Sequence, residues 1–408
     1  MILKMAWKNI WRKKLRSSVV ITSIIVGLVG GILYMGIMNG MMYQRIGSAI
    51  ATEVSHIQIH NEKFLENEEL KFSITNSTTI INKLKKTKAI RSVCSRIITT
   101  GMASTARTGS GVEIIGINPD KEKTVSNLYT KLIDSTSSYF NTKARLPILI
   151  GERLAKKLNA KRKSKIILTF QSASGELTGG AFKVVGIFRT QNSSFDEMKV
   201  FVRKADIAKL VNIPTETSHE IAIMLKNDEL LKQEKENLKK EFKELTVSPW
   251  QETMPELGMM EESMNYMLYI LMIIILLAIA FGIVNTMLMV VFERTKELGM
   301  LMCIGLSRKK VFSMILLETM FLSITGGIIG LTISVLLVNW LSVDGIDLSI
   351  VSEGLQVWGY DTIIYPDVEI SYYINTGLLV VALAILSAIY PARKAIKLKP
   401  VEAVRIDN

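Results

Sequence analysis

Four long apolar stretches constrain the fold of this chain more than any other feature of its sequence. They cover residues 19–42, 264–292, 311–341 and 374–390. About 20 consecutive apolar residues are enough to cross the hydrocarbon core of a bilayer as an α-helix. The only charged residue inside the four stretches is Glu318. The sequence therefore predicts an integral membrane protein with four transmembrane helices.

The first stretch follows a basic segment, KMAWKNIWRKKLRSS, as the apolar region of a secretory signal does. It is longer than such a region, and no cleavage site built from small residues follows it. We therefore expect this stretch to remain uncleaved as the first transmembrane helix.

The distribution of lysine and arginine predicts the orientation, because basic residues gather in the short cytoplasmic flanks of transmembrane helices. Three flanks are basic; they contain Lys4, Lys8, Arg12, Lys13, Lys14 and Arg16, then Arg294, Lys296, Arg308, Lys309 and Lys310, then Arg393, Lys394, Lys397, Lys399 and Arg405. The segment 342–373 has no basic residue and contains Asp344, Asp347, Glu353, Asp361, Asp367 and Glu369. We expect both termini in the cytoplasm, and 342–373 with the long insert on the other side. The net charge of +13 is then a signal of orientation, so nucleic acid is not an expected partner.

The insert between the first two stretches has the mixed patterns of an α+β domain, in one or two parts. Alternating apolar residues predict strands at 53–60, 111–117, 165–170, 182–188 and 198–202, and helical spacing predicts helices at 78–86, 151–158, 205–210 and 228–245. The predicted organisation is 1–42 (N-terminal segment and first transmembrane helix), 43–263 (α+β domain with a stalk) and 264–408 (the other three transmembrane helices). Helical spacing also continues outward from residue 264 to about Pro255, which predicts that the second transmembrane helix extends into the stalk.

The insert has no motif of a catalytic or metal site. His56 and His60 would share a strand face, but no third ligand accompanies them. Cys94 and Cys303 lie on opposite sides of the membrane in this topology, so they cannot form a disulfide. The sequence contains no phosphate-binding loop of the type GxxxxGK[ST]. A membrane-anchored enzyme or receptor therefore has no motif in its favour.

The segment 293–310 separates the second and third stretches and reads ERTKELGMLMCIGLSRKK. Leu298, Leu301, Met302 and Ile304 can form the apolar stripe of a short helix that ends at Gly305, a residue that tolerates the left-handed conformation. Ser307 is suited to cap the next helix. Two interpretations remain open from these residues alone: a connector on the membrane surface, or an apolar ridge that docks on a cytoplasmic partner.

The same segment resembles the cytoplasmic motif of the ABC transporter permeases that include FtsX, MacB and the lipoprotein-releasing LolC and LolE proteins. The matching residues are Glu293, Arg294, Glu297, Leu298, Gly299, Leu301, Ile304 and Gly305. The C-terminal segment YPARKAIKLKPVEAVR (390–405) is similar to the family's second signature, with Pro400, Val401, Glu402 and Ala403. The resemblance implies that these permeases pair, alike or paralogous, and that segment 293–310 docks on a separate ATPase dimer. ATP and magnesium would be bound by that partner, and this chain would have no cofactor.

Within the family, the residues MNG (38–40) followed by SHIQIH (55–60) are similar to the lipoprotein-releasing branch. That branch implies an inner-membrane protein with a periplasmic domain, and as partners a lipoprotein substrate, a periplasmic carrier and membrane lipid. The alternative is an unfused permease of the MacB type for the efflux of peptides or drugs. One departure lies at 159–166, where the family has a Gly-Asp turn.

Lipoprotein release requires a path for acyl chains near the outer leaflet. The candidate lining residues are Met38, Met42, Met264, Met267 and Leu271, with Gly36 and Gly40 as small residues that let helices part. Ordinary helix packing is the alternative for each of them. Gly27 and Gly31 predict a close helix contact, and Asn285 is the expected hydrogen-bond partner of Glu318.

Overall fold

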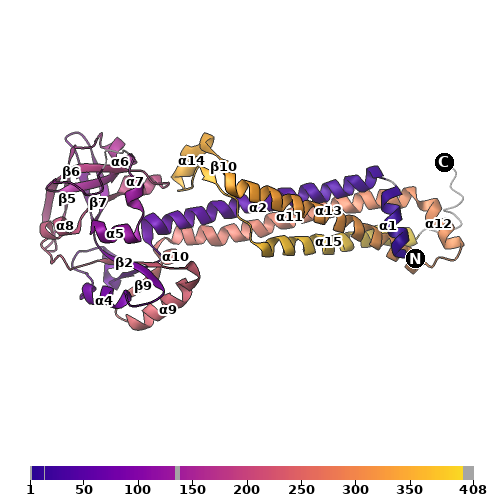
Figure 1. Ribbon diagram of the computed structural model, residues 1–408, viewed down its shortest axis with the longest axis horizontal. Helices are drawn as coiled ribbons and strands as arrows, with labels where there is room; N and C mark the ends of the chain where they lie inside the picture. The colour runs from indigo at the N-terminus through magenta and orange to yellow at the C-terminus, as the bar shows by residue number, and fades with distance from the viewer. Residues whose placement is uncertain (1, 13, 134–137, 398–408) are drawn as a thin grey trace. The chain divides into compact units, whose positions relative to one another are not determined.

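The structure is a computed structural model in which residues 2–12, 14–133 and 138–397 are described. Its contacts divide the chain into two compact units. The helical unit comprises Met1–Met42, Glu262–Asp347 and Ile363–Asn408, and the sheet unit comprises Tyr43–Glu261 and Leu348–Thr362. Figure 1 shows the elements of both units, which are described separately below.

Four long helices form the helical unit, and each is long and apolar enough to cross a membrane. They are α2 (Lys14–Ser48), α11 (Pro255–Glu293), α13 (Arg308–Asp344) and α15 (Ile370–Ile396). Every one is longer than the apolar stretch that predicted it, because the helices continue into polar flanking residues. Helix α11 begins at Pro255, so the predicted extension of the second membrane helix is confirmed.

Side chains of all four helices share one buried apolar cluster. Small residues bring the helices close together. A Cβ atom on Gly27 would lie 2.7 Å from Ile279 Cδ1, and one on Gly31 would lie 3.1 Å from Ile275 Cδ1, so the predicted close contact of these glycines is made with α11. This packing is tight enough that a single methyl group would disturb it.

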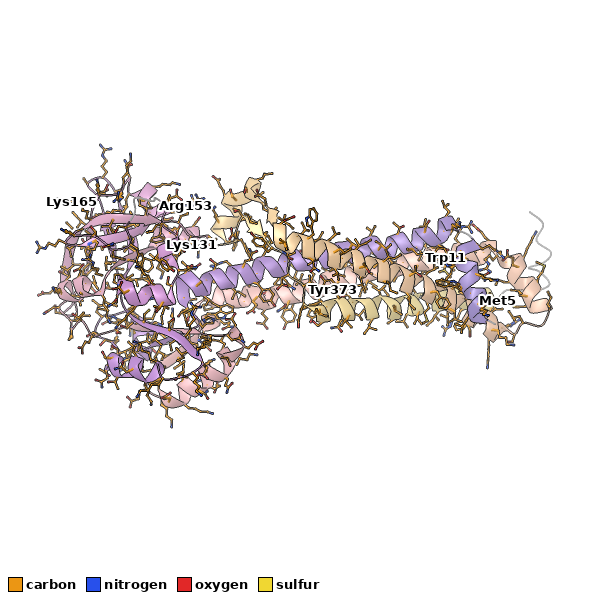
Figure 2. The ribbon with its side chains drawn as sticks, viewed as in Figure 1. Met5, Trp11, Lys131, Arg153, Lys165 and Tyr373 are labelled. Carbon is orange, nitrogen blue, oxygen red and sulfur yellow. The ribbon has the colours of Figure 1, made fainter. Side chains whose placement is uncertain are left out.

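The shorter elements of the helical unit are α1 (Ile2–Arg12), α12 (Thr295–Cys303) and a two-stranded hairpin of β10 (Ile346–Asp347) and β11 (Ile363–Ile364). Helix α1 was not predicted, although Ala6 and Ile10 have helical spacing and both are buried against the main helices. Trp7 and Trp11 lie on its half-exposed side (Figure 2).

The sheet unit is built around nine strands, in the order β3-β7-β4-β6-β5-β2-β8-β1-β9. Their bounds are β1 (Ile57–His60), β2 (Ile90–Ser104), β3 (Gly109–Ile117), β4 (Pro147–Gly151), β5 (Lys165–Gln171), β6 (Leu177–Phe188), β7 (Lys199–Arg203), β8 (Glu220–Leu225) and β9 (Thr246–Pro249). Because β2 also pairs with β3, six strands close into a ring. The first half of β2 leaves the ring and pairs with β8, so one long strand belongs to both parts of the unit.

Each part of the sheet unit has its own apolar core, as expected of a domain in two parts. Alternate residues of the ring strands, such as Ile148 and Ile150 on β4, point into the first core, while Leu149 between them joins a separate outer cluster. The covering helices are α3 (Glu62–Asn67), α4 (Ser77–Leu84), α5 (Pro119–Val125), α6 (Glu152–Lys157), α7 (Ser193–Met198), α8 (Lys204–Leu210), α9 (Leu231–Glu241), α10 (Trp250–Thr253) and α14 (Ser352–Val357).

Most predicted elements of the insert are present, with two differences at their ends. The strand predicted at 53–60 begins only at Ile57, because α2 continues through a π-helix (Ala49–Val54) that ends at Ser55 with a φ of 68°. The helix predicted at 228–245 covers only Leu231–Glu241. The strands predicted at 165–170 and 182–188 are confirmed as β5 and β6, which pair with each other antiparallel.

Candidate coupling site

Helix α12 follows α11 and precedes α13 in the chain, and it contains Glu297, Leu298, Gly299 and Leu301 of the predicted docking motif. It ends at Cys303, and Gly305 just beyond it has a φ of 103°, the positive φ that the sequence predicted there. Ser307 has the extended backbone of an N-cap residue, but its side chain makes no capping hydrogen bond to α13.

The residues of the predicted apolar stripe do not all face the same side: some are buried and others are exposed. Leu298 is buried, and Leu301 and Met302 pack against the core of the helical unit. Ile304 is 84% exposed, and Met300 is half-exposed. Gly299 is buried beside Leu298. The inward residues therefore anchor α12 to its own helices, and only Met300 and Ile304 present apolar surface to solvent.

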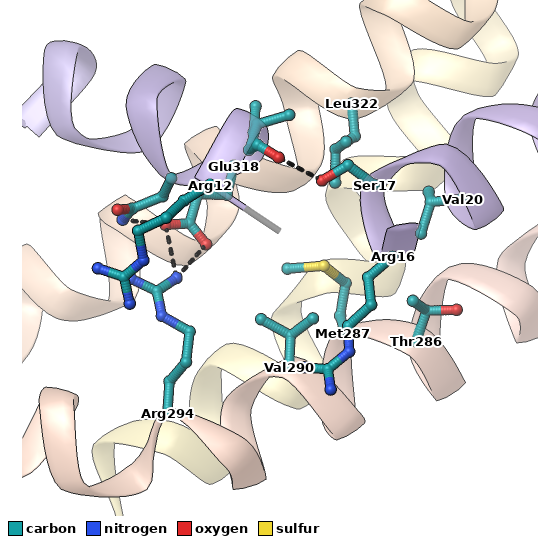
Figure 3. Close-up of a pocket in the computed structure, with 12 residues that line it drawn as sticks. Arg12, Arg16, Ser17, Val20, Thr286, Met287, Val290, Arg294, Glu318 and Leu322 are labelled. Carbon is teal, nitrogen blue, oxygen red and sulfur yellow. Dashed lines mark hydrogen bonds and ion pairs between the residues drawn. The ribbon is translucent and has the colours of Figure 1, made fainter. Parts of the chain in front are cut away.

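Arg294 joins α12 to α13 through a buried ion pair. Its Nη1 lies 3.1 Å from both carboxylate oxygens of Glu318 (Figure 3). Its Nε lies 3.1 Å from Glu297 Oε2. Glu318 also accepts a hydrogen bond of 2.6 Å from Asn9 Nδ2 on α1. The guanidinium group is thus held by carboxylates from two helices.

The prediction that Asn285 would be the partner of Glu318 is wrong. Asn285 is exposed on α11, whereas Glu318 faces Arg294 and Asn9. The cost of a charge in the bilayer predicts that Glu318 faces the interior, and Glu318 is buried there, but which polar group it meets depends on how α1 packs.

Two further ion pairs connect the motif to the N-terminal region. Arg12 at the end of α1 pairs with Glu297, and Arg16 at the start of α2 pairs with Glu293. Partial desolvation raises the pKa of Glu297, but hydrogen bonds and positive charge from Arg294 and Arg12 outweigh it and hold that pKa below its ordinary value. Both acids of the motif are therefore paired with arginines of the same chain.

A small cavity of about 40 Å³ lies beside this network. Figure 3 shows its lining, which comes from α1, α2, α11 and α13 together with Arg294. Such a volume has room for a few water molecules at most. The ion pairs and hydrogen bonds beside the cavity connect these helices to one another.

The sequence alone did not identify Asn9, Arg12 and Arg16 as parts of this site. Arg12 and Arg16 were used only to predict which side of the membrane their segment lies on. That argument says nothing about which residues they contact. The spacing of Arg12 and Arg16, four residues apart, and of Glu293 and Glu297, also four apart, was the available signal. It could not reveal that the two pairs face each other, because they are almost 300 residues apart in the chain.

The residues predicted to line an acyl path differ in how exposed they are. Met267 is 55% exposed, and Leu271 is partly exposed. Met38 and Met264 pack against a small apolar cluster that contains Met35, Leu268 and Met272, and Met42 is buried.

Gly36 and Gly40 contact a segment of their own chain. A Cβ on either residue would come within 3.0 Å of residues 365–368, and the backbone N–H of Asp367 donates a hydrogen bond of 3.0 Å to the Gly36 carbonyl. These glycines therefore make room for their own chain between β11 and α15.

Two other predicted features have local explanations or lie outside the described residues. His56 Nε2 lies 2.5 Å from Asp228 Oδ1, and His60 forms hydrogen bonds with Gln58 and the His219 carbonyl, so both rings have protein partners.

In the C-terminal signature, Pro391 lies within α15. Pro400, Val401, Glu402 and Ala403 lie outside the described residues.

Comparison with known proteins identifies the family. Residues 269–400, which contain the whole coupling site except its N-terminal partners, match the FtsX-like permease C-terminal domain. Residues 269–400 therefore form an FtsX-like permease domain, as in the ABC transporter permeases to which the chain is similar. The predicted family is thereby confirmed.

Two relatives of this permease align along almost its whole length. It is 26% identical to the lipoprotein-releasing system transmembrane protein LolC of Buchnera aphidicola, over 98% of this chain and 96% of that protein. It is 23% identical to the ABC transporter permease YknZ of Bacillus subtilis, over 99% of this chain and 98% of that protein. The macrolide export protein MacB of Chlorobaculum tepidum is 32% identical, but over 31% of this chain and 17% of its own length.

Among solved structures, this permease is similar to the periplasmic region of MacB from Actinobacillus actinomycetemcomitans. The match has 11% identity and a TM-score of 0.33, and it covers 54% of this chain and 97% of that one. The extracellular domain of YknZ matches with 15% identity and a TM-score of 0.30, over 44% of this chain and 87% of that one.

Proposed function

We propose that this permease couples ATP hydrolysis by a partner subunit to the extraction of lipoproteins from the inner membrane toward a periplasmic carrier. The observation that carries the proposal is the alignment with LolC, which extends over both the helical and the sheet unit. The other participants are an ATPase dimer that binds ATP and magnesium, a second permease that is identical or paralogous, and the surrounding lipid. Both termini lie in the cytoplasm and the sheet unit lies in the periplasm, as the distribution of lysine and arginine indicates.

Force from the ATPase enters at α12. Met300 and Ile304 contact the partner, since they are the exposed apolar residues of this helix. The inward face transmits the movement, because Arg294 connects α12 to Glu318 on α13 and Arg12 connects it to α1. The pair of Arg16 with Glu293 connects the adjoining end of α11 to α2. A push on α12 is thereby passed to the membrane helices.

A substitution of Ile304 tests docking without disturbing the fold, because this residue is exposed. The Ile304→Glu variant should assemble poorly with the ATPase, because a buried carboxylate in the contact is costly. Ile350 is 99% exposed in another part of the chain, so Ile350→Glu is the matched control. Co-purification of the two subunits measures the effect. Equal assembly of both variants would remove α12 as the docking element.

A photo-crosslinker at Met267 tests the cargo. Met267 is 55% exposed near the start of the apolar part of α11, and Phe292 is 54% exposed at the other end of the same helix. The Met267 probe should capture acylated lipoprotein before ATP is added and lose it afterwards, while the Phe292 probe should capture lipid alone. Crosslinks from Met267 to a soluble peptide or drug, with none to lipoprotein, would favour the alternative function.

That alternative is the efflux of peptides or drugs by an unfused permease of the MacB type. The matches to MacB proteins favour it, although each covers a limited part of those proteins. The same crosslinking experiment decides between the two functions.

Thiol labelling tests the orientation, but the choice of residue matters. Cys94 is buried, so it is a poor reporter, whereas Cys303 is exposed. Lys165 is exposed on the sheet unit (Figure 2), so Lys165→Cys combined with Cys303→Ser supplies the opposite reporter. In intact spheroplasts an impermeant reagent should label the Lys165→Cys variant and leave Cys303 of the unchanged chain unmodified. The reverse pattern would invert the topology.

A further inference from the structure

The sheet unit contains a polar cavity with a buried lysine that has no carboxylate partner. The cavity has a volume of about 340 Å³, and Lys204 at the start of α8 lines it. Only 8% of Lys204 is exposed. Its Nζ donates hydrogen bonds of 2.9 Å to Ser95 Oγ and 3.0 Å to Ser218 Oγ, which are neutral acceptors. Among the described residues, no ion pair involves this ammonium group.

The rest of the lining adds positive charge. Lys85, Lys121 and Arg203 face the cavity together with Lys204, and Glu216 is the single acidic residue in the lining. Arg203 donates hydrogen bonds of 3.0 Å to the carbonyls of Phe140 and Thr142, which are neutral acceptors, and Asp206 outside the lining is the acid that interacts with its charge. The cavity is therefore strongly positive and has little to neutralise it from within.

The first residues of a helix border the same cavity. Ser77 and Thr78 open α4 (Ser77–Leu84) and belong to the lining. The preceding residue, Asn76, is in the left-handed conformation, and its side chain makes no capping hydrogen bond. The first backbone N–H groups of a helix have no partner within it, and the helix dipole adds positive potential there. Both features favour a bound anion.

The protonation of Lys204 reflects this lack of a counter-charge. Burial, and then the positive charge of Lys121, lower its pKa to about 8. Arg96 shows the contrasting case one residue beyond Ser95 on β2, since it is buried but paired with Glu122 at 2.5 Å and Glu220 at 2.7 Å. Arg96 therefore has two carboxylate partners, whereas no carboxylate of the described residues forms an ion pair with Lys204.

We propose that this cavity binds an oxyanion of the phosphate type, with the Lys204 ammonium as its central ligand. Lys85 and Lys121 close the mouth of the site, and the start of α4 adds N–H donors. A volume of about 340 Å³ accommodates such an anion with several water molecules, since each water occupies about 30 Å³. Inorganic phosphate and the phosphodiester headgroup of a lipid both present this chemistry. The site does not depend on the transport function proposed above.

The test uses the full-length permease in detergent at pH 7, where Lys204 is mostly protonated. Sodium phosphate is titrated against sodium chloride of matched ionic strength, with the thermal midpoint and calorimetric binding as readouts. We expect a saturable rise of the midpoint with phosphate, because a ligand that binds only the folded state stabilises it. Lys204→Met should weaken binding by at least about tenfold, the effect of losing a charged hydrogen bond.

Two further variants keep the test decisive if Lys204→Met folds poorly. Lys85 and Lys121 are exposed, so Lys85→Gln with Lys121→Gln should leave the fold intact and still weaken phosphate binding several-fold. Lys165→Met changes an exposed lysine on β5, away from the cavity lining, and should bind as the unchanged chain does.

Glycerophosphoglycerol, the deacylated headgroup of phosphatidylglycerol, distinguishes the sources of the anion. Tighter binding of this phosphodiester than of orthophosphate indicates a lipid headgroup, and the reverse indicates free phosphate. The proposal is overturned if neither compound gives a saturable effect, or if the Lys85→Gln/Lys121→Gln variant binds both as tightly as the unchanged chain.

Discussion

Arg294 in the helical unit and Lys204 in the sheet unit are both buried cations, yet their surroundings are opposite. Arg294 meets two carboxylates, Glu318 and Glu297, whereas Lys204 meets two hydroxyl groups. A buried charge is tolerated when it is paired, and an unpaired one favours either deprotonation or a ligand. The difference separates a charge that joins helices from a charge that is available for binding.

The largest expected effect comes from breaking the paired charge. Arg294→Met leaves Glu318 buried without its partner, which should reduce the free energy of unfolding by about 3–5 kcal/mol. Arg294→Met combined with Glu318→Met removes both charges and should restore most of that loss. Denaturant unfolding in detergent measures both variants, with Arg308→Met as the control because Arg308 is exposed. A loss below about 1 kcal/mol for Arg294→Met would show that the pair does not hold these helices.

Two glycines of α2 differ in the space that surrounds them, which allows tight and open packing to be compared. A Cβ on Gly40 would overlap the Tyr365 carbonyl, while one on Gly30 would meet nothing within 4 Å. Gly40→Ala should cost about 1–3 kcal/mol, as overpacking typically does. Gly30→Ala, on the same helix, should be neutral or stabilise by up to about 1 kcal/mol through helix propensity. Similar thermal midpoints for the two variants would contradict the packing of residues 365–368 against α2.

The unpaired lysine should make stability depend on pH. Because its pKa is about 8 in the folded chain and 10.5 when unfolded, the unfolded chain binds more protons between these values. Stability should therefore rise with pH from about 8 toward 10.5, relative to the Lys204→Met variant. The thermal midpoints of the two chains across this range measure the contribution. A constant difference between them would show that Lys204 is charged to the same extent in both states.

The smallest effect is expected for the half-exposed pair of Arg12 and Glu297. Exposed ion pairs contribute about 0–1 kcal/mol, so a double-mutant cycle with Arg12→Ala and Glu297→Ala should give a coupling energy in that range. Lowering the pH through the pKa of Glu297, which lies below its ordinary value, should abolish the coupling. A coupling energy above about 2 kcal/mol would mean that this pair is as important as the buried one.

Much of the helical unit could be predicted from the sequence because its signals are local. The lengths of the apolar stretches predicted four membrane helices, and helical spacing predicted the start of α11 at Pro255 and the end of α12 just before Gly305. In the sheet unit, alternation predicted β3, β5, β6 and β7, because each pattern is contained within a few residues, but it missed β4. The closure of six strands into a ring was not predictable, since it depends on which distant strands pair.

By itself, the sequence determined the four membrane helices and the FtsX-like permease motif, because apolar length and motif residues can each be read along the chain. Only the tertiary structure decided which charges are neutralised. Arg294 and Glu318 are 24 residues apart, and Asn9 and Glu318 are 309 apart, so their contact depends on the packing of α1, α12 and α13. Likewise, nothing near Lys204 in the sequence distinguishes it from the other lysines. It becomes a candidate ligand because folding buries it beside hydroxyl groups and other cations, where no carboxylate of the described residues forms an ion pair with it.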